Sequence, residues 1–168
     1  MKNNTQTIDS VEYEVIETGS TQILSELPIE YANDEEITKP ENTSQAKLFI
    51  GNLDGEKVFT TLDKKSGKIS GDLIVEDQNL FFIAESIEKL LDKEKPWTEN
   101  IERKNGKDDL LICFQSSWSH NLPAPFERIV VRNRRKYLLD GLRSHLLGLE
   151  LPLTTAKKLV EEIKKITS

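Results

Sequence analysis

Five of the six cationic side chains between residues 126 and 149 could share one face of a helix. On a helical wheel at about 100° per residue, they fall within an arc of about 100°. A cationic arc of this kind binds phosphate groups, and aromatic rings beside it stack on bases. The five cations are Arg128, Arg132, Arg135, Lys136 and Arg143, and the two rings are Tyr137 and Trp118. We predict that these seven residues bind the partner.

The chain also contains carboxylates that offer these cations an internal partner. Residues 1–46 hold two basic and ten acidic residues, whereas residues 126–168 hold ten basic and five acidic ones. Ion pairs with the acidic N-terminal segment, or with Glu127, Asp140 and Glu150, are therefore the alternative. The formal net charge of −6 argues against general affinity for nucleic acid, because like charges repel. Internal pairing or a protein partner is thus favoured over phosphate binding.

The sequence offers little for catalysis or metal binding. Cys113 is the single cysteine, and His120 and His145 are too far apart to form a metal-binding pair at zinc-finger or i, i+4 spacing. Ser117 and Ser119 lie near His120, but no glycine-framed nucleophile elbow or phosphate-binding loop is present. We therefore predict a protein that is not an enzyme and that binds no cofactor or metal.

The cationic residues need an element to position them, and their spacing predicts a helix over residues 126–149. Ile129-Val130-Val131 is β-branched, so a strand before the helix is the alternative there. Pro152 ends this element, and a final helix follows with an apolar stripe. The stripe consists of Ala156, Leu159, Val160, Ile163 and Ile166. Residues 117–168 are thus predicted to form a basic helical hairpin packed on the rest of the chain.

Residues 47–116 have the pattern of an α+β core. Strands are predicted over residues 47–51 and 57–62 and around Ile69–Val75, joined by turns at Asp54-Gly55 and residues 63–67. A short apolar run, Leu80–Ala84, predicts a fourth strand. A helix capped by Ser86 should follow and end near Pro96, and Leu110–Phe114 predicts a buried strand. The expected fold is an antiparallel β-meander with one packed helix, followed by the helical hairpin.

Residues 1–46 form an acidic N-terminal segment that we predict to be partly disordered. Val11–Val15 alternates with period two, which is typical of a strand. Ile23, Leu24 and Leu27 could share one face of a short helix before Pro28. Residues 31–45 are nearly free of apolar side chains and favour a loop or disorder.

Targeting signals are not evident in the sequence. The opening residues contain no apolar signal region, and no apolar run approaches the ~18 residues that a membrane-spanning helix needs. A single cysteine fits a reducing compartment. We predict a cytoplasmic protein without a membrane partner.

Two resemblances to known families bear on the core. Leu48–Leu53 looks like the first-strand hexamer of RNA-recognition motifs, where an aromatic residue stacks on a base. The matching octamer would be Gln78–Glu85, which lacks the basic residue, the glycine and the last aromatic of that motif. The two turn signals also fall where that fold needs its first helix.

Residues 47–92 more closely resemble the second half of the SUKH superfamily of immunity-type domains. The parallels are Asp54-Gly55, Ser66-Gly67-Lys68 and the helix start within Ile83–Leu91, and Leu27–Tyr31 looks like that family's LPxxY helix. Ile87 and Leu90 replace the usual aromatics, and the span from Leu27 to Phe49 is short for the family. The resemblance implies a non-catalytic domain that neutralises a toxin by binding it.

The sequence therefore predicts a non-enzymatic protein-binding protein, of the immunity or adaptor type, that acts through its charged terminal segments. The alternative is a nucleic-acid-binding accessory protein that uses the basic face of the helix over residues 126–149.

Overall fold

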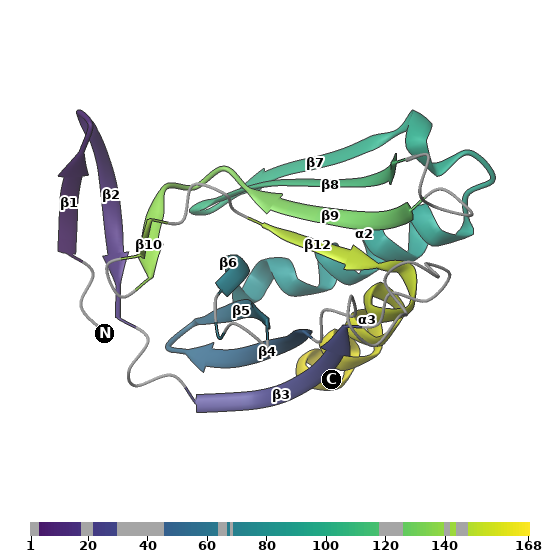
Figure 1. Cartoon of the computed structure of the whole chain (residues 1–168), viewed down its shortest axis with the longest axis horizontal. Coiled ribbons are helices and arrows are strands. Elements are labelled where there is room, and N and C mark those ends of the chain that lie inside the picture. Colours follow the sequence, from purple (N-terminus) through teal and green to yellow (C-terminus); the bar gives the residue numbers. More distant parts are fainter. Residues whose placement is uncertain are drawn as a thin grey trace.

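The computed structural model describes residues 4–17, 22–29, 46–63, 67, 69–117, 126–139, 142–143 and 148–168. These residues form three four-stranded sheets and two α-helices (Figure 1). The predicted α+β class is confirmed. Neither helix in the described part of the chain is long and apolar enough to cross a membrane.

The first sheet is an antiparallel arrangement of strands that follow one another in the chain. It consists of β3 (Gln22–Ile29), β4 (Ala46–Leu53), β5 (Glu56–Asp63) and β6 (Ile69–Glu76). Asp54 and Gly55 join β4 to β5, and Gly55 has a φ of +76°, which glycine adopts without strain. A short 3-10 helix, η1 (Asp77–Asn79), then leads into helix α2 (Leu80–Asp92).

Two predictions for this part of the chain are wrong. Leu80–Ala84 is not a strand but the start of α2, and Ser86 lies inside that helix, where its hydroxyl donates to the carbonyl oxygen of Phe82 at 2.7 Å. The buried residues of α2 follow the helical period, while Phe81 is 52% exposed. An apolar run of five residues contains too little periodicity to distinguish helix from strand.

The second sheet has the same plan as the first. The 3-10 turn η2 (Pro96–Thr98) leads to β7 (Asn100–Asn105), β8 (Asp108–Ser117), β9 (Phe126–Asn133) and β12 (Leu149–Pro152). These strands pair as antiparallel neighbours, and helix α3 (Leu153–Thr167) follows β12. The predicted stripe of the final helix is confirmed, because Ala156, Leu159, Val160 and Ile163 are buried.

The helix predicted over residues 126–149 is wrong, and with it the helical hairpin. Residues 126–133 form β9, which pairs with β8 on one side and β12 on the other. Ile129 and Val131 point into the main core, as alternate residues of a strand do. The β-branched run at 129–131 favours this conformation, which is the strand alternative left open by the sequence.

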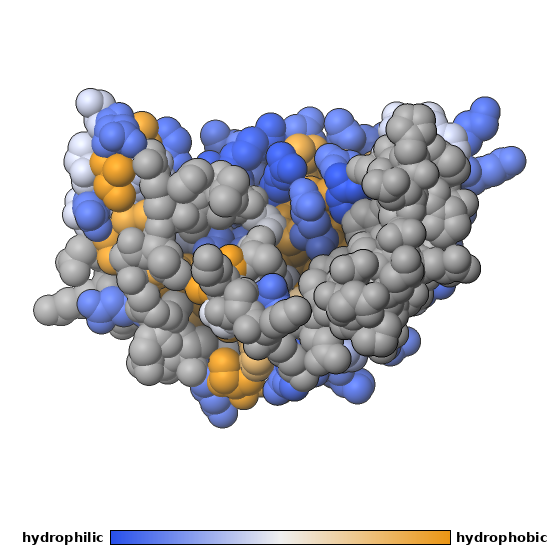
Figure 2. All heavy atoms as spheres, in the orientation of Figure 1, coloured by the Kyte–Doolittle hydropathy of each residue, from blue (hydrophilic) through white to orange (hydrophobic). Residues whose placement is uncertain are grey.

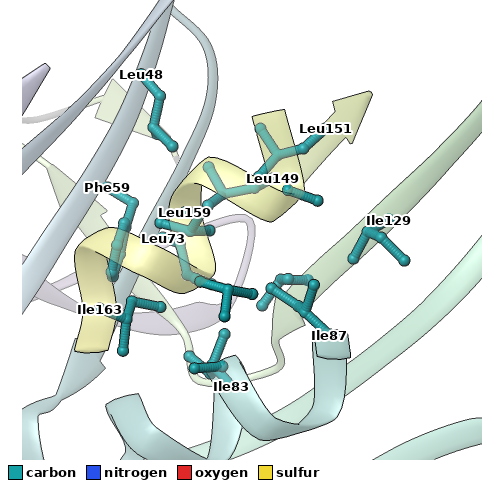
Figure 3. Close-up of a cluster of buried hydrophobic side chains, with 14 of the residues drawn as sticks. Leu48, Phe59, Leu73, Ile83, Ile87, Ile129, Leu149, Leu151, Leu159 and Ile163 are labelled. Carbon is teal, nitrogen blue, oxygen red and sulfur yellow. The ribbon is translucent and has the colours of Figure 1, made fainter. Parts of the chain in front are cut away.

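The chain thus repeats a unit of four antiparallel strands and one helix. The first unit runs from β3 to α2 and the second from β7 to α3. The helices pack together and each reaches the other unit's sheet: α2 contacts β8, and α3 contacts β3. In the shared core, Ile83 and Ile87 of α2 lie near Leu159 and Ile163 of α3, with side chains of both sheets around them (Figure 3).

The third sheet joins the N-terminal strands to the segment that follows β9. It consists of β1 (Asn4–Ile8), β2 (Val11–Ile16), β10 (Tyr137–Leu139) and β11 (Leu142–Arg143), with β2 and β10 parallel. It packs on the first sheet through a second apolar cluster. That cluster consists of Ile16, Leu53, Val58, Ile74, Tyr137 and Leu139. The strand predicted at residues 11–15 is therefore confirmed as β2.

The predicted segment boundaries do not separate packing units in the described structure. β3 of the N-terminal segment pairs with β4, β2 pairs with β10, and β8 pairs with β9. The short helix predicted around Ile23–Leu27 is wrong, because these residues lie in β3, where Leu27 and Ile29 alternate toward the core. The loop predicted over residues 31–45 lies outside the described residues.

The first two sheets come close together where Gly71 of β6 meets Gly148, which directly precedes β12. A Cβ atom at position 71 would lie 2.7 Å from the carbonyl oxygen of Gly148 and 2.9 Å from Oγ1 of Thr61. Gly71→Ala should therefore lower the free energy of unfolding by about 1–3 kcal/mol, because the backbones must move apart. Equilibrium urea denaturation measures this loss, and unchanged or increased stability would contradict the close approach.

Candidate functional site: a buried ionic junction

Asp108 is the centre of a polar cluster in which the first two sheets meet. It is 1% exposed at the start of β8. Its Oδ2 accepts hydrogen bonds from the backbone N–H of Glu76 at 2.9 Å and from Nδ2 of Asn79 at 2.7 Å. Its Oδ1 accepts one from Nδ2 of Asn133 at 2.9 Å. One carboxylate therefore connects β8 with β6, η1 and β9.

Arg135 extends this cluster to the third sheet. Its side chain is 5% exposed and its Nη2 lies 3.2 Å from both carboxylate oxygens of Glu56 on β5. Its Nε donates to Oε2 of Glu14 on β2 at 3.2 Å, and its Nη1 lies 3.5 Å from Oδ1 of Asp108. We call Arg135 and these three carboxylates the ionic junction. It places one cation between charges from three sheets.

Together, the carboxylates around Arg135 raise the pKa of its guanidinium group more than burial lowers it. Burial lowers the pKa of the guanidinium group, but Glu56, Glu14 and Asp108 together raise that pKa above its ordinary value. Lys107 adds a second, more exposed cation at 3.7 Å from both Glu14 and Glu56. A buried guanidinium with several carboxylate partners is held in its charged form.

Two of the other predicted partner-binding residues lie close to a carboxylate of the same chain. Arg128 and Arg132 lie on β9, at 3.7 Å and 3.8 Å from the carboxylate of Glu150. Arg128 also donates to Oε1 of Gln115 at 3.0 Å. The internal pairing weighed in the sequence is thus present for Arg128 and Arg132 with Glu150, and for Arg135 with Glu14 of the N-terminal segment.

The structure describes the remaining predicted residues to different extents. Lys136 is exposed, and its carbonyl oxygen accepts a hydrogen bond from the backbone N–H of Glu14 at 3.3 Å. Arg143 is in β11, where only the backbone is described, and Trp118 lies outside the described residues. Tyr137 is 1% exposed and therefore offers no surface for stacking on a base.

Tyr137 instead connects β10 to β6 through its hydroxyl group. The hydroxyl accepts a hydrogen bond from the N–H of Ile74 at 3.0 Å and donates one to the carboxyl group of Asp72. Asp72 is 4% exposed, and burial raises its pKa to about 6, although the hydrogen bond from Tyr137 lowers it. Burial also raises the pKa of Tyr137, so its hydroxyl stays protonated.

A groove lies between the two helices, away from the junction. It has a volume of about 320 Å³ and is lined by Leu91 and Val160 together with charged side chains of both signs. The charged residues are Glu88 and Asp92 of α2 and Lys157, Glu161 and Lys164 of α3. Lys164 and Glu88 form an ion pair at 2.9 Å, with both side chains nearly half exposed.

The charged groups of the junction contact one another. Among the described residues, no group of three or more His, Cys, Asp or Glu side chains is placed to hold a metal ion. The sequence did not predict Asp108, Asn133 or Glu56 as site residues, because single polar residues beside strands have the same pattern as turns.

No family model and no curated protein matches this chain.

Removing the central cation tests the junction. Arg135→Met should lower the free energy of unfolding by about 3–5 kcal/mol, because Glu56 and Asp108 would stay buried without their cation. Arg134→Met is the matched control: Arg134 is 48% exposed and pairs with Glu102 and Asp109 at the surface. The control should change stability by less than about 1 kcal/mol. Equal losses in chemical denaturation would contradict the assignment.

The buried carboxyl group of Asp72 predicts a pH-dependent stability. Its pKa is about 6 in the folded chain and 3.8 in the reference state, so the folded chain binds the proton more tightly. The stability from this group is present below about pH 4, falls as the pH rises to about 6, and stays lost above that. Asp72→Asn should therefore add about 1–3 kcal/mol at pH 7.5.

The same substitution should add almost nothing at about pH 4, where the carboxyl group of the folded chain is already neutral. Denaturation at the two pH values measures the difference. A gain of the same size at both would show that the charge of Asp72 is not the cause.

Proposed function

We propose that this chain is a non-enzymatic protein-binding protein of the immunity or adaptor type that acts in the cytoplasm. It contacts its partner through the groove between α2 and α3. The contact combines the apolar floor at Leu91 and Val160 with the charged rim of both helices. A protein partner fits such a surface, because protein interfaces combine an apolar centre with a polar, solvent-accessible rim.

The observation that carries the proposal is the mixed charge of the groove, which is lined by lysines and carboxylates of α2 and α3. Arg128, Arg132 and Arg135 are engaged by carboxylates of the same chain. Lys157 and Lys164 of α3 line the groove beside Glu88 and Asp92. A rim with both signs of charge suits a protein partner with complementary charges and does not suit the uniform charge of a phosphate backbone.

The immunity-type part of the proposal rests on the resemblance of residues 47–92 to the SUKH superfamily. Asp54-Gly55 is the turn between β4 and β5, and Ile83–Leu91 lies in a helix that packs on a sheet. Leu27 and Ile29, in contrast, lie in strand β3 and not in the helix that the family has at this place. The adaptor reading does not depend on this resemblance.

The test starts from full-length protein purified at native expression from its own host. A stoichiometric partner should be retained, and the purified pair should form a 1:1 complex measurable by calorimetry. Lys164→Glu should weaken this complex about tenfold or more, which is about 1.4 kcal/mol, because it reverses a charge on the groove rim.

Lys165→Glu is the matched control on the same helix. Lys165 is 74% exposed, does not line the groove, and also loses an ion pair when substituted, with Glu162 at 3.3 Å. The control complex should keep its affinity within about twofold. Equal affinities for the two variants would place the contact elsewhere, and the absence of any stoichiometric partner would contradict protein binding itself.

A further inference from the structure

The outer strands of the sheets differ in how they are protected against pairing with another chain. β3 contains Pro28, and its register shifts between Ile23 and Ser25. Helix α3 covers part of this strand: Thr155 donates to the carbonyl oxygen of Pro28, and Ser25 donates to Glu162. Proline, an irregular register and a covering helix are all features that block strand addition.

β7 is protected by charge. Three consecutive charged residues, Glu102, Arg103 and Lys104, occupy the middle of this edge strand, and all three are exposed. In the orientation of Figure 1, β7 lies along the upper border of the molecule, and Figure 2 shows mainly hydrophilic residues there. Charged side chains on an edge strand oppose pairing with a second strand.

β1 has none of these features. Its sequence, Asn-Thr-Gln-Thr-Ile, contains no charge and no proline, and it pairs with β2 without a register shift. Thr5, Gln6 and Thr7 are exposed at the edge of the third sheet. Figure 1 shows β1 at the end of the molecule farthest from the other two sheets, with β2 between it and the rest. β6, the other edge of the first sheet, has the N–H and C=O of Ile74 engaged by the side chains of Tyr137 and Asn133. Among the described edge strands of five or more residues, β1 is thus the unprotected one.

We propose that β1 pairs with β1 of a second copy of this chain, antiparallel and centred on Gln6. The third sheets of the two copies then join into one eight-stranded sheet. This pairing is separate from the groove between the helices and does not depend on the proposed function.

The hairpin geometry determines which backbone groups of β1 are available. Asp9 and Ser10 form a two-residue turn with φ values of 51° and 65°, as a type I′ turn requires. Ile8 and Val11 beside the turn are then a hydrogen-bonded pair, and the pairs alternate along the strands. Thr5 and Thr7 therefore direct their N–H and C=O groups away from β2, toward the free edge.

This pattern matches a two-fold axis through Gln6. In antiparallel pairing about that residue, Thr5 of one copy faces Thr7 of the other, and both pairs form backbone hydrogen bonds with the groups that point outward. Gln6 faces Gln6 in the non-bonded position between them. The Thr-Gln-Thr sequence is symmetric about this point, so neutral β-branched side chains meet across the interface, and cross-strand threonine pairs are favourable.

The proposed interface is small and should give a weak dimer whose population rises with concentration. Sedimentation velocity of the full chain from about 1 µM to about 500 µM should show the sedimentation coefficient increasing toward that of a dimer. Gln6→Lys and Gln6→Glu should each keep the chain monomeric over this range, because like charges would face each other at the axis. An equimolar mixture of the two variants should restore the dimer.

Disulfide formation gives a direct test of the register. Facing residues in a non-bonded antiparallel pair have Cα atoms about 4.5 Å apart, which a disulfide spans. Gln6→Cys should therefore form a covalent dimer under mild oxidation, whereas Glu12→Cys, an exposed control on β2, should not. The native Cys113 is buried, so it should not contribute.

The proposal is overturned if the wild-type chain stays monomeric up to the highest concentration, or if both cysteine variants cross-link equally. It is also overturned if the mixture of charged variants associates no better than either variant alone.

Discussion

The contact between Arg135 and the carboxylates of Glu14, Glu56 and Asp108 is the interaction on which the arrangement of the three sheets depends. Each carboxylate comes from a different sheet, and the arginine lies in the connection between β9 and β10. Burying these charges costs free energy, which their mutual attraction offsets only when all of them are in place. The junction therefore favours the one arrangement in which the three sheets meet and disfavours partial ones.

The apolar core alone would not select this arrangement. Both four-stranded units bury their helices in one shared cluster, and the third sheet adds only a small cluster on the opposite face of the first sheet. Apolar contacts of this kind are not directional and tolerate alternative packings. The hydrogen bonds of Asp108 to Glu76, Asn79 and Asn133 depend on geometry, so they specify how β6, η1 and β9 meet β8.

The same constraint explains why Arg135 is not part of an exposed binding surface. Arg135 is paired with Glu14 of the β1–β2 hairpin. The basic groups beside the groove are Lys157 and Lys164 of α3. We propose that function belongs to two outer surfaces of the molecule, the groove between α2 and α3 and the free edge of β1. The polar interior serves to hold those two surfaces in place.

Sequence patterns predicted the elements with clear periodicity. β4 and β5 follow from alternating residues around Asp54-Gly55, and α3 follows from its apolar stripe. The spacing of four between Arg128 and Arg132 fits one face of a helix and also one face of a strand, so it could not decide between them. The junction was beyond prediction, because Asp108 and Asn133 owe their importance to residues far away in the chain. The repeat of the two units is visible only in the topology.

A double-mutant cycle between Glu56 and Arg135 tests the central claim most directly. The free energies of unfolding of Glu56→Gln, Arg135→Met and the double variant are compared with that of the wild type. The account predicts that the two single losses together exceed the loss in the double variant by more than about 1 kcal/mol, because each single substitution leaves the other charge buried. Additivity within about 0.5 kcal/mol would contradict the claim that this ion pair holds the sheets together.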